Sequence, residues 1–314
     1  MNKKAFEFTF GWMFAIIVGG VILFLALYFS SNLLKTENKI SDTKTAKEIG
    51  IILNPVENSL GEERTTLITY PVETRVYNKC RTLGNFGQQE ISVASSARGG
   101  KWEEPGNPSI FYNKYIFSED MIEGRENIVL SKSFEIPFKT ADLLYIWPDS
   151  EKYCFIDPPS YIEKEIERLE LRNINISSIE KCEKKSRKVC FSGVGTKCSI
   201  VVNLREKSVK KNEKKVFYED DLNNALLYGA IFASPEIYEC QVKRLMKRTS
   251  ELSIVYADKS RALSVKGCSS NLDFELIAYS NATLSFANSK EIESINKMSE
   301  EIRRKNELLS CKLF

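Results

Sequence analysis

The segment from Phe8 to Leu34 contains no charged residue, and it constrains the fold more than any other feature of the chain. A secretory signal peptide has an apolar core of roughly 7–15 residues that ends at a small-residue cleavage site. This uncharged run is about twice as long as such a core, and no clear cleavage site follows it. A helix of roughly 20 residues crosses the hydrocarbon core of a bilayer. A buried core helix is the alternative, but such helices rarely stay uncharged over this length. We therefore predict a retained transmembrane helix.

The orientation of this helix does not follow from its flanking charges. Basic residues lie on both sides of the run, at Lys3, Lys4, Lys35, Lys39, Lys44 and Lys47. However, a long domain can cross the membrane largely regardless of its charge. The chain has 8 cysteines, and an even number of cysteines is typical of disulfide-bonded domains outside the cytosol. Asn175 and Asn281 begin N-glycosylation sequons, which belong to the same compartment. We predict a cell-membrane protein with a cytoplasmic N-terminus and an extracellular C-terminal domain.

Small residues recur every four positions inside the run, at Gly11, Ala15 and Gly19. This spacing places them on one face of a helix, where small side chains let two helices approach closely in lipid. Gly and Ala are also common in membrane helices that do not associate. The partners that we expect are the lipid bilayer and either a second copy of the chain or another membrane or envelope protein.

The remainder of the chain predicts an α+β fold, because short alternating runs rich in turn formers give way to longer helical patterns. The predicted divisions, in order, are a basic cytoplasmic N-terminus (1–7), a transmembrane helix (8–34), a helical stalk (35–54), a β-rich domain (55–159), a mixed cysteine-rich strand segment (160–218) and a helical C-terminal region (219–314). The stalk is expected to end before Pro55, because the residue before a proline disfavours helical conformation. A flexible stalk is the alternative.

The cysteines favour disulfides over a metal site. Structural zinc sites use cysteines two to four residues apart, whereas the closest cysteines here are separated by seven residues. Cys80 and Cys154 are the only cysteines of the predicted β-rich domain, and their pairing would close a large loop. The strand segment and the helical region then hold three each, which implies a bridge between these regions or two free thiols. These six are Cys182, Cys190, Cys198, Cys240, Cys268 and Cys311.

The sequence gives only weak signs of catalytic, metal-binding or phosphate-binding residues. The chain has no histidine, which excludes histidine-based zinc sites and the Ser-His-Asp and Cys-His catalytic arrangements. Carboxylate pairs such as Glu103-Glu104 and Asp220-Asp221 carry no sign of facing each other. The loop 192–197 resembles a phosphate-binding loop superficially but lacks its spacing, so we interpret it as a turn. We predict no catalytic residue, no metal ligand and no cofactor.

A basic stripe lies in the predicted helix that follows Ser234. Its residues are Lys243, Arg244, Lys247 and Arg248. Such a stripe can bind acidic glycan, lipid headgroups or nucleic acid. Acidic residues such as Glu251 are interleaved nearby, so a solvated helix face is the simpler interpretation. Nucleic acid is not an expected partner, although the net charge of +3 by itself argues neither for nor against one.

Lys3-Lys4-Ala5, followed by Phe6-Glu7 and the apolar helix, resembles the N-terminus of archaeal type IV pilin-like proteins. The resemblance implies cleavage after Ala5 and an apolar helix that stays on the subunit and packs in a filament core. Bacterial pilins have a glutamate five residues after the cut, whereas here Glu7 would be second. The rest of the chain resembles uncharacterised single-span membrane proteins of small-genome archaea, through stretches such as NFGQQEISV, PSIFYNKYIFS and PEIYECQVKRLMKR.

These features together predict a membrane-anchored extracellular protein with a structural or adhesive role, such as a pilin-like subunit or a component of an envelope complex. A binding module that contacts acidic glycan or nucleic acid through the basic stripe is the alternative, and a membrane-tethered hydrolase ranks third.

Overall fold

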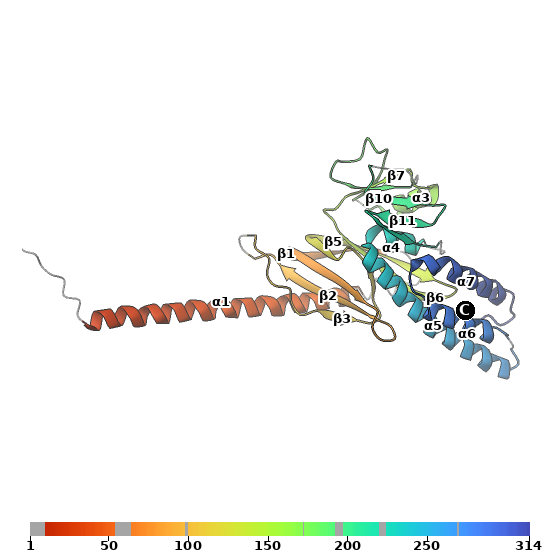
Figure 1. The fold of residues 1–314 in the computed structure, drawn as a ribbon, viewed down its shortest axis with the longest axis horizontal. Helices are drawn as coiled ribbons and strands as arrows, with labels where there is room; N and C mark the ends of the chain where they lie inside the picture. The colour runs from red at the N-terminus through yellow and green to blue at the C-terminus, as the bar shows by residue number, and fades with distance from the viewer. Residues whose placement is uncertain are drawn as a thin grey trace, which may run out of the picture.

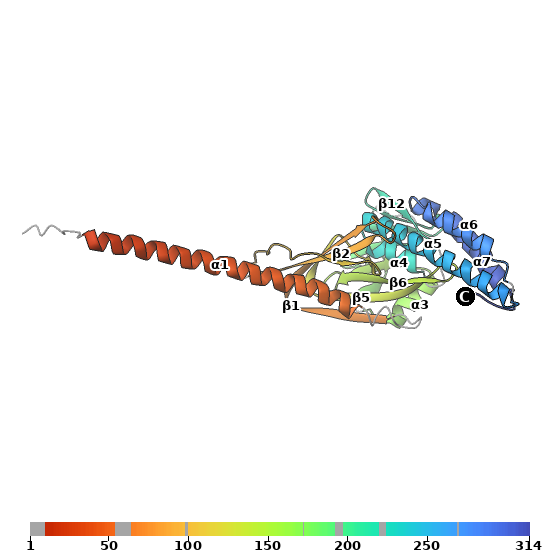
Figure 2. The same ribbon diagram turned by 90° about the horizontal axis from the view of Figure 1, so that it is seen from below.

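The computed structural model describes residues 10–53, 64–97, 100–171, 173–191, 197–219, 224–268 and 270–314. One long helix, α1 (Phe10–Ile52), projects from a body made of two β-sheets and a group of helices (Figures 1 and 2). The fold class is therefore α+β, as the sequence predicted.

The helix α1 runs without a break through the predicted span and most of the predicted stalk. Its first half is exposed, whereas Ala46, Ile49 and Leu53 are buried near its end. These residues follow a spacing of three and four, which places them on one helix face. That face packs against the first sheet, mainly on β2. Pro55 lies outside the described residues.

The first sheet has the strand order β3-β2-β1-β5-β6-β4. All of its neighbouring strands are antiparallel except β4 and β6. The bounds are β1 (Arg64–Arg81), β2 (Gln88–Ser95), β3 (Ser109–Phe111), β4 (Tyr115–Phe117), β5 (Met121–Glu135) and β6 (Lys139–Pro148).

Both faces of this sheet are covered. Along β6, Leu143, Tyr145 and Trp147 belong to one core cluster, whereas Leu144 and Ile146 belong to another. Successive side chains of a strand point to opposite faces, so the two clusters lie on opposite sides of the sheet. The α1 residues join the second cluster, and the helices α4 and α5 join the first.

The second sheet has the order β12-β11-β10-β9-β7-β8. Its strands are β7 (Tyr153–Ile156), β8 (Ile174–Ile176), β9 (Arg187–Cys190), β10 (Ile200–Asn203), β11 (Ser208–Lys211) and β12 (Lys214–Phe217). Helix α3 (Ser160–Leu169) connects β7 to β8, which pair in parallel. Parallel neighbours need such a crossover. The predicted β-rich domain (55–159) includes β7, but this strand pairs in the second sheet. Strand periodicity does not tell which sheet a strand joins.

The helical part consists of α4 (Ala225–Phe232), α5 (Pro235–Val265), α6 (Asp273–Leu284), the short 3₁₀ helix η1 (Ser289–Glu291) and α7 (Ile292–Glu307). Ser234 caps α5 by accepting a hydrogen bond from the amide of Ile237, as expected for a serine before a helix that begins with proline. Gly267 follows α5 with a φ of 84°, a conformation that glycine adopts without strain.

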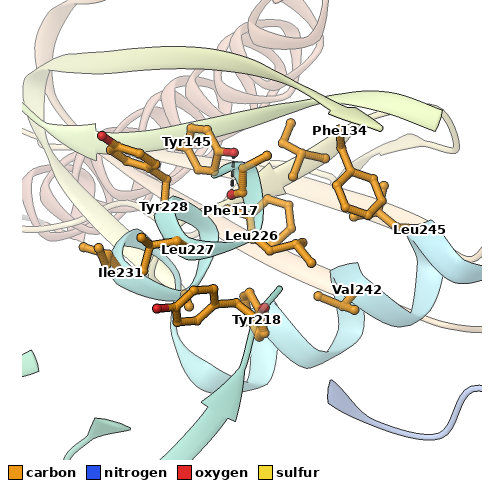
Figure 3. Close-up of a cluster of buried hydrophobic side chains, with 14 of the residues drawn as sticks. Phe117, Phe134, Tyr145, Tyr218, Leu226, Leu227, Tyr228, Ile231, Val242 and Leu245 are labelled. Atoms are coloured by element: carbon orange, nitrogen blue, oxygen red, sulfur yellow. Dashed lines mark hydrogen bonds between the residues drawn. The ribbon is translucent and has the colours of Figure 1, made fainter. Parts of the chain in front are cut away.

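The buried helix α4 joins the two sheets (Figure 3). The Tyr145 hydroxyl of β6 donates a hydrogen bond of 2.7 Å to the Ala225 carbonyl at the start of α4. At the other end, the Phe232 ring stacks on Trp147 of the first sheet and meets Tyr153 of the second edge-on, with ring centroids 4.3 and 5.0 Å apart.

The cysteines form four pairs: Cys80–Cys240, Cys154–Cys182, Cys190–Cys198 and Cys268–Cys311. The predicted pairing of Cys80 with Cys154 is therefore wrong, and so is the predicted bridge between the strand segment and the helical region. Cys80 instead links the end of β1 to α5. Cys154 belongs to the second sheet and links β7 to the loop before β9. No free thiol remains.

Candidate functional site

The first half of α1 is long and apolar enough to cross a membrane. The candidate span covers Phe10–Ser30, has a mean hydropathy of 2.5, and has no residue buried in the body. Gly11, Ala15 and Gly19 all lie in this exposed part. A Cβ atom built on Gly11 or Gly19 would meet no atom within 4 Å. The face that they form is therefore accessible to lipid or to another helix.

The second half of α1 is fixed to the body by polar contacts as well as by packing. The Asp42 carboxylate is 2% exposed and accepts hydrogen bonds from the amide and the hydroxyl of Ser95 in β2. The Thr43 hydroxyl accepts one from the Asn107 amide at 2.9 Å. Gly106 lies so close to the Thr43 backbone that a Cβ atom there would approach the Thr43 nitrogen to 2.6 Å. The body therefore holds this part of α1 in one position.

A groove of 610 Å³ lies between α1 and the segment that follows β2. Its helix wall is formed by Thr36, Lys39, Ile40 and Thr43, which are spaced as one helix face. The opposite wall is formed by Trp102, Glu103, Glu104 and Asn107. This size is typical of ligand pockets, and the groove contains charges of both signs beside apolar side chains.

Trp102 is held in place at the groove. Its backbone forms a bridge with Ser96, and the Arg75 guanidinium lies over its ring at 3.9 Å from the centroid. Arg75 in turn pairs with Glu123 through a contact of 2.7 Å. A cation over the face of a tryptophan is a favourable contact. The indole is therefore an ordered wall of the groove.

The basic stripe of α5 has mainly internal contacts. Arg244 is 0% exposed, and its guanidinium donates to the carbonyls of Phe86, Tyr112 and Lys114 and to the Gln241 side chain. Burial lowers the pKa of Arg244 to about 10, so the guanidinium remains charged at neutral pH. A side chain in this position fixes the loops at the end of the first sheet and does not contact an external polymer.

Two further members of the stripe, Lys247 and Arg248, also donate to main-chain carbonyls. Lys247 donates to the carbonyls of Thr82 and Gly84, and Arg248 donates to the carbonyl of Thr140. Lys243 is half-buried. Because three of the four cations are directed at main-chain carbonyls, the structure does not bring the stripe together as an anion-binding surface.

A charged cleft of 510 Å³ lies where the two sheets meet. Arg187 of β9 pairs with Glu119 at 2.6 Å and also with Glu151. Lys211 of β11 lies 3.4 Å from Glu119 and donates to the Ala233 carbonyl. Burial lowers the pKa of Lys211 to about 8. Glu119 and Glu151, from two segments, thus both contact the guanidinium of Arg187.

Both sequon asparagines are exposed, Asn175 on the edge strand β8 and Asn281 on α6. The Thr283 hydroxyl of the second sequon is buried and donates to the carbonyls of Tyr279 and Ser280. Glu103 and Glu104 line the groove described above. The pair Asp220-Asp221 and the loop residues 192–196 lie outside the described residues.

No protein-family model, curated protein or solved structure matches the chain. The groove and the docking residues Asp42 and Gly106 were not predicted from the sequence. One signal for Asp42 was present, because it shares the helical spacing of Ala46, Ile49 and Leu53 and so lies on the packed face of α1.

Proposed function

We propose that the chain is a single-pass surface protein that assembles through α1 and presents its disulfide-bonded body outside the cell. Its role is structural or adhesive, as a pilin-like subunit or as an anchored component of an envelope complex. The observation that supports this proposal is the continuity of α1, which passes from a fully exposed apolar span into a docked stalk without a break.

A continuous helix has a mechanical consequence. A flexible linker would let the body rotate freely over the membrane, whereas a helix fixed by Asp42, Thr43 and the buried apolar residues holds the body at a set position relative to the span. This rigid coupling favours a protein whose body must be held in register with neighbours. It is not required of an enzyme that is merely tethered.

The cysteines support the proposed orientation. All four pairs are formed within the chain, and structural disulfides persist in oxidising compartments outside the cytosol. The binding-module alternative has less support, because most of the basic stripe on α5 is engaged by main-chain carbonyls.

The assembly is tested by a matched pair of substitutions, Gly19→Leu and Gly20→Leu. Both glycines lie in the exposed span, and a Cβ atom on either would meet nothing within 4 Å. Their positions differ by about 100° around the helix, so only Gly19 lies on the face shared with Gly11 and Ala15. The full chain is purified from membranes in mild detergent, and its oligomeric mass is measured by light scattering.

The proposal expects Gly19→Leu to reduce the oligomeric fraction and Gly20→Leu to leave it unchanged, because only the first substitution blocks close helix approach. Equal behaviour of both variants, or a monomeric parent protein, contradicts assembly through this face. Intact-mass analysis of the same preparation tests the pilin-like version, which expects an N-terminus that begins at Phe6. An uncut Met1 contradicts that version.

A further inference from the structure

The groove beside α1 lies close to where the bilayer would end. Thr36 is six residues beyond Ser30, the end of the candidate span, which corresponds to about 9 Å along a helix. The uncharged sequence continues to Leu34, so a span shifted toward the body would reduce this distance to about 3 Å. The headgroup layer is roughly 5–8 Å thick on each side of the hydrocarbon core. The Thr36 end of the groove therefore lies at the level of the headgroups.

The groove is closed at its far end. Gly106 and Asn107 meet α1 at Thr43, through the close backbone approach and the hydrogen bond of 2.9 Å. From that point the helix wall extends two turns back toward the span, through Ile40 and Lys39 to Thr36. Figure 1 shows the span end of α1 leaving the body in this direction. An occupant can therefore enter from the membrane side.

The side chains around the groove fit a zwitterionic ligand. Lys39 provides an ammonium group for a phosphate, and the Glu104 carboxylate can accept from an amino group. Ile40, which is 64% exposed, and the ordered indole of Trp102 provide apolar contact between these charges. A groove with a cation on one wall and carboxylates on the other favours a ligand that carries both signs over a purely anionic one.

We propose that this groove binds the headgroup of a membrane lipid that carries both a phosphate and an amino group. The bound lipid would fix the height of the body above the bilayer, because its phosphate contacts Lys39, one turn before the residues that dock α1 on the first sheet. The inference rests on the proposed membrane anchoring of α1, but it does not depend on self-assembly.

The test uses the full chain in vesicles with a photoreactive benzophenone residue in place of Ile40. Ile51 is the matched control, because it is an exposed isoleucine of the same helix that does not line the groove. Vesicles contain phosphatidylcholine mixed with phosphatidylethanolamine or with phosphatidylglycerol. After irradiation, mass spectrometry identifies the adduct as lipid or as a second protein chain.

We expect a phosphatidylethanolamine adduct at position 40 and none at position 51. Lys39→Ala should reduce the adduct about tenfold, as the loss of one charge-assisted contact predicts. Lys47→Ala is the matched control, since this exposed lysine lies two turns farther along α1. Soluble phosphoethanolamine added to the same vesicles should reduce the adduct at position 40, because it offers the groove the same phosphate and amino group.

Three outcomes overturn the inference. They are a protein–protein adduct at position 40, equal adducts at both positions, and an adduct with phosphatidylglycerol as strong as that with phosphatidylethanolamine. A separate measurement isolates failure of the anchoring itself, because a chain that does not span the bilayer is released from the vesicles by alkaline carbonate. A chain that stays in the membrane without a lipid adduct contradicts the groove and leaves the proposed function standing.

Discussion

The long strands of the first sheet lie between two helical layers, whereas the strands of the second sheet have three or four residues each and carry two short-range disulfides. In the first sheet, β1 and β5 have 18 and 15 residues and bury side chains on both faces. Short strands bury less apolar surface and so gain less from packing. The second sheet is therefore expected to depend more on covalent links and on its contact with the first.

The first disulfide to test is Cys80–Cys240, which joins the first sheet to α5 across 160 residues. In the chain-entropy model its removal lowers the free energy of unfolding by about 5 kcal/mol, compared with about 2.5 kcal/mol for the short loop of Cys190–Cys198. Both double serine variants are compared by urea unfolding of the full chain in detergent. If loss of Cys190–Cys198 lowers the free energy of unfolding more than loss of Cys80–Cys240 does, the second sheet depends on its disulfides even more than loop length predicts.

The second test removes the aromatic contact that both sheets share. Phe232→Ala takes away a ring that stacks on Trp147 and meets Tyr153, and such a change in a core typically costs about 3–5 kcal/mol. Hydrogen exchange followed by mass spectrometry reports the two sheets separately. We expect faster exchange in β7–β10 than in β1 and β5, and uniform loss across both sheets would show that they unfold as one unit.

Features set by neighbouring residues could be predicted from the sequence, whereas contacts between distant segments could not. The packed face of α7 and the capped start of α5 follow from local spacing and residue type, and the structure has both. The partner of Cys80 does not follow locally, because Cys240 approaches it only after α5 has packed against the sheet. The groove is equally non-local, since its walls come from segments about 60 residues apart. Arg244 looked like a surface cation because its carbonyl acceptors belong to distant loops.

The third test concerns the lysine at the junction of the sheets. Lys211 has its pKa lowered to about 8 by burial, from an ordinary value of 10.5. Between these two values the unfolded chain holds a proton that the folded chain has lost, so stability rises with pH in this window. The full effect is on the order of 3 kcal/mol. Thermal unfolding from pH 7 to 11 should show this rise in the parent chain.

Two variants isolate the contribution of this lysine. Lys211→Met removes the titrating group and should remove the rise, whereas Lys210→Met changes the exposed neighbour on the same strand and should keep it. The difference between the two pH profiles is the measured quantity, because other groups titrate in this range in all three proteins. Parallel profiles for Lys211→Met and the parent chain would contradict a junction in which this lysine is buried.

The smallest expected effect concerns the stalk and leaves both sheets intact. Asp42→Ala leaves the amide and hydroxyl of Ser95 without their buried acceptor, which typically costs about 1–3 kcal/mol. Because the contact joins α1 to β2 only, hydrogen exchange should increase at residues 42–53 and along β2, while the second sheet keeps its protection. The exposed Glu48→Ala on the same helix is the control and should change neither region. Increased exchange in the second sheet after Asp42→Ala would mean that the stalk stabilises the whole body, and the independence of the two sheets would then be wrong.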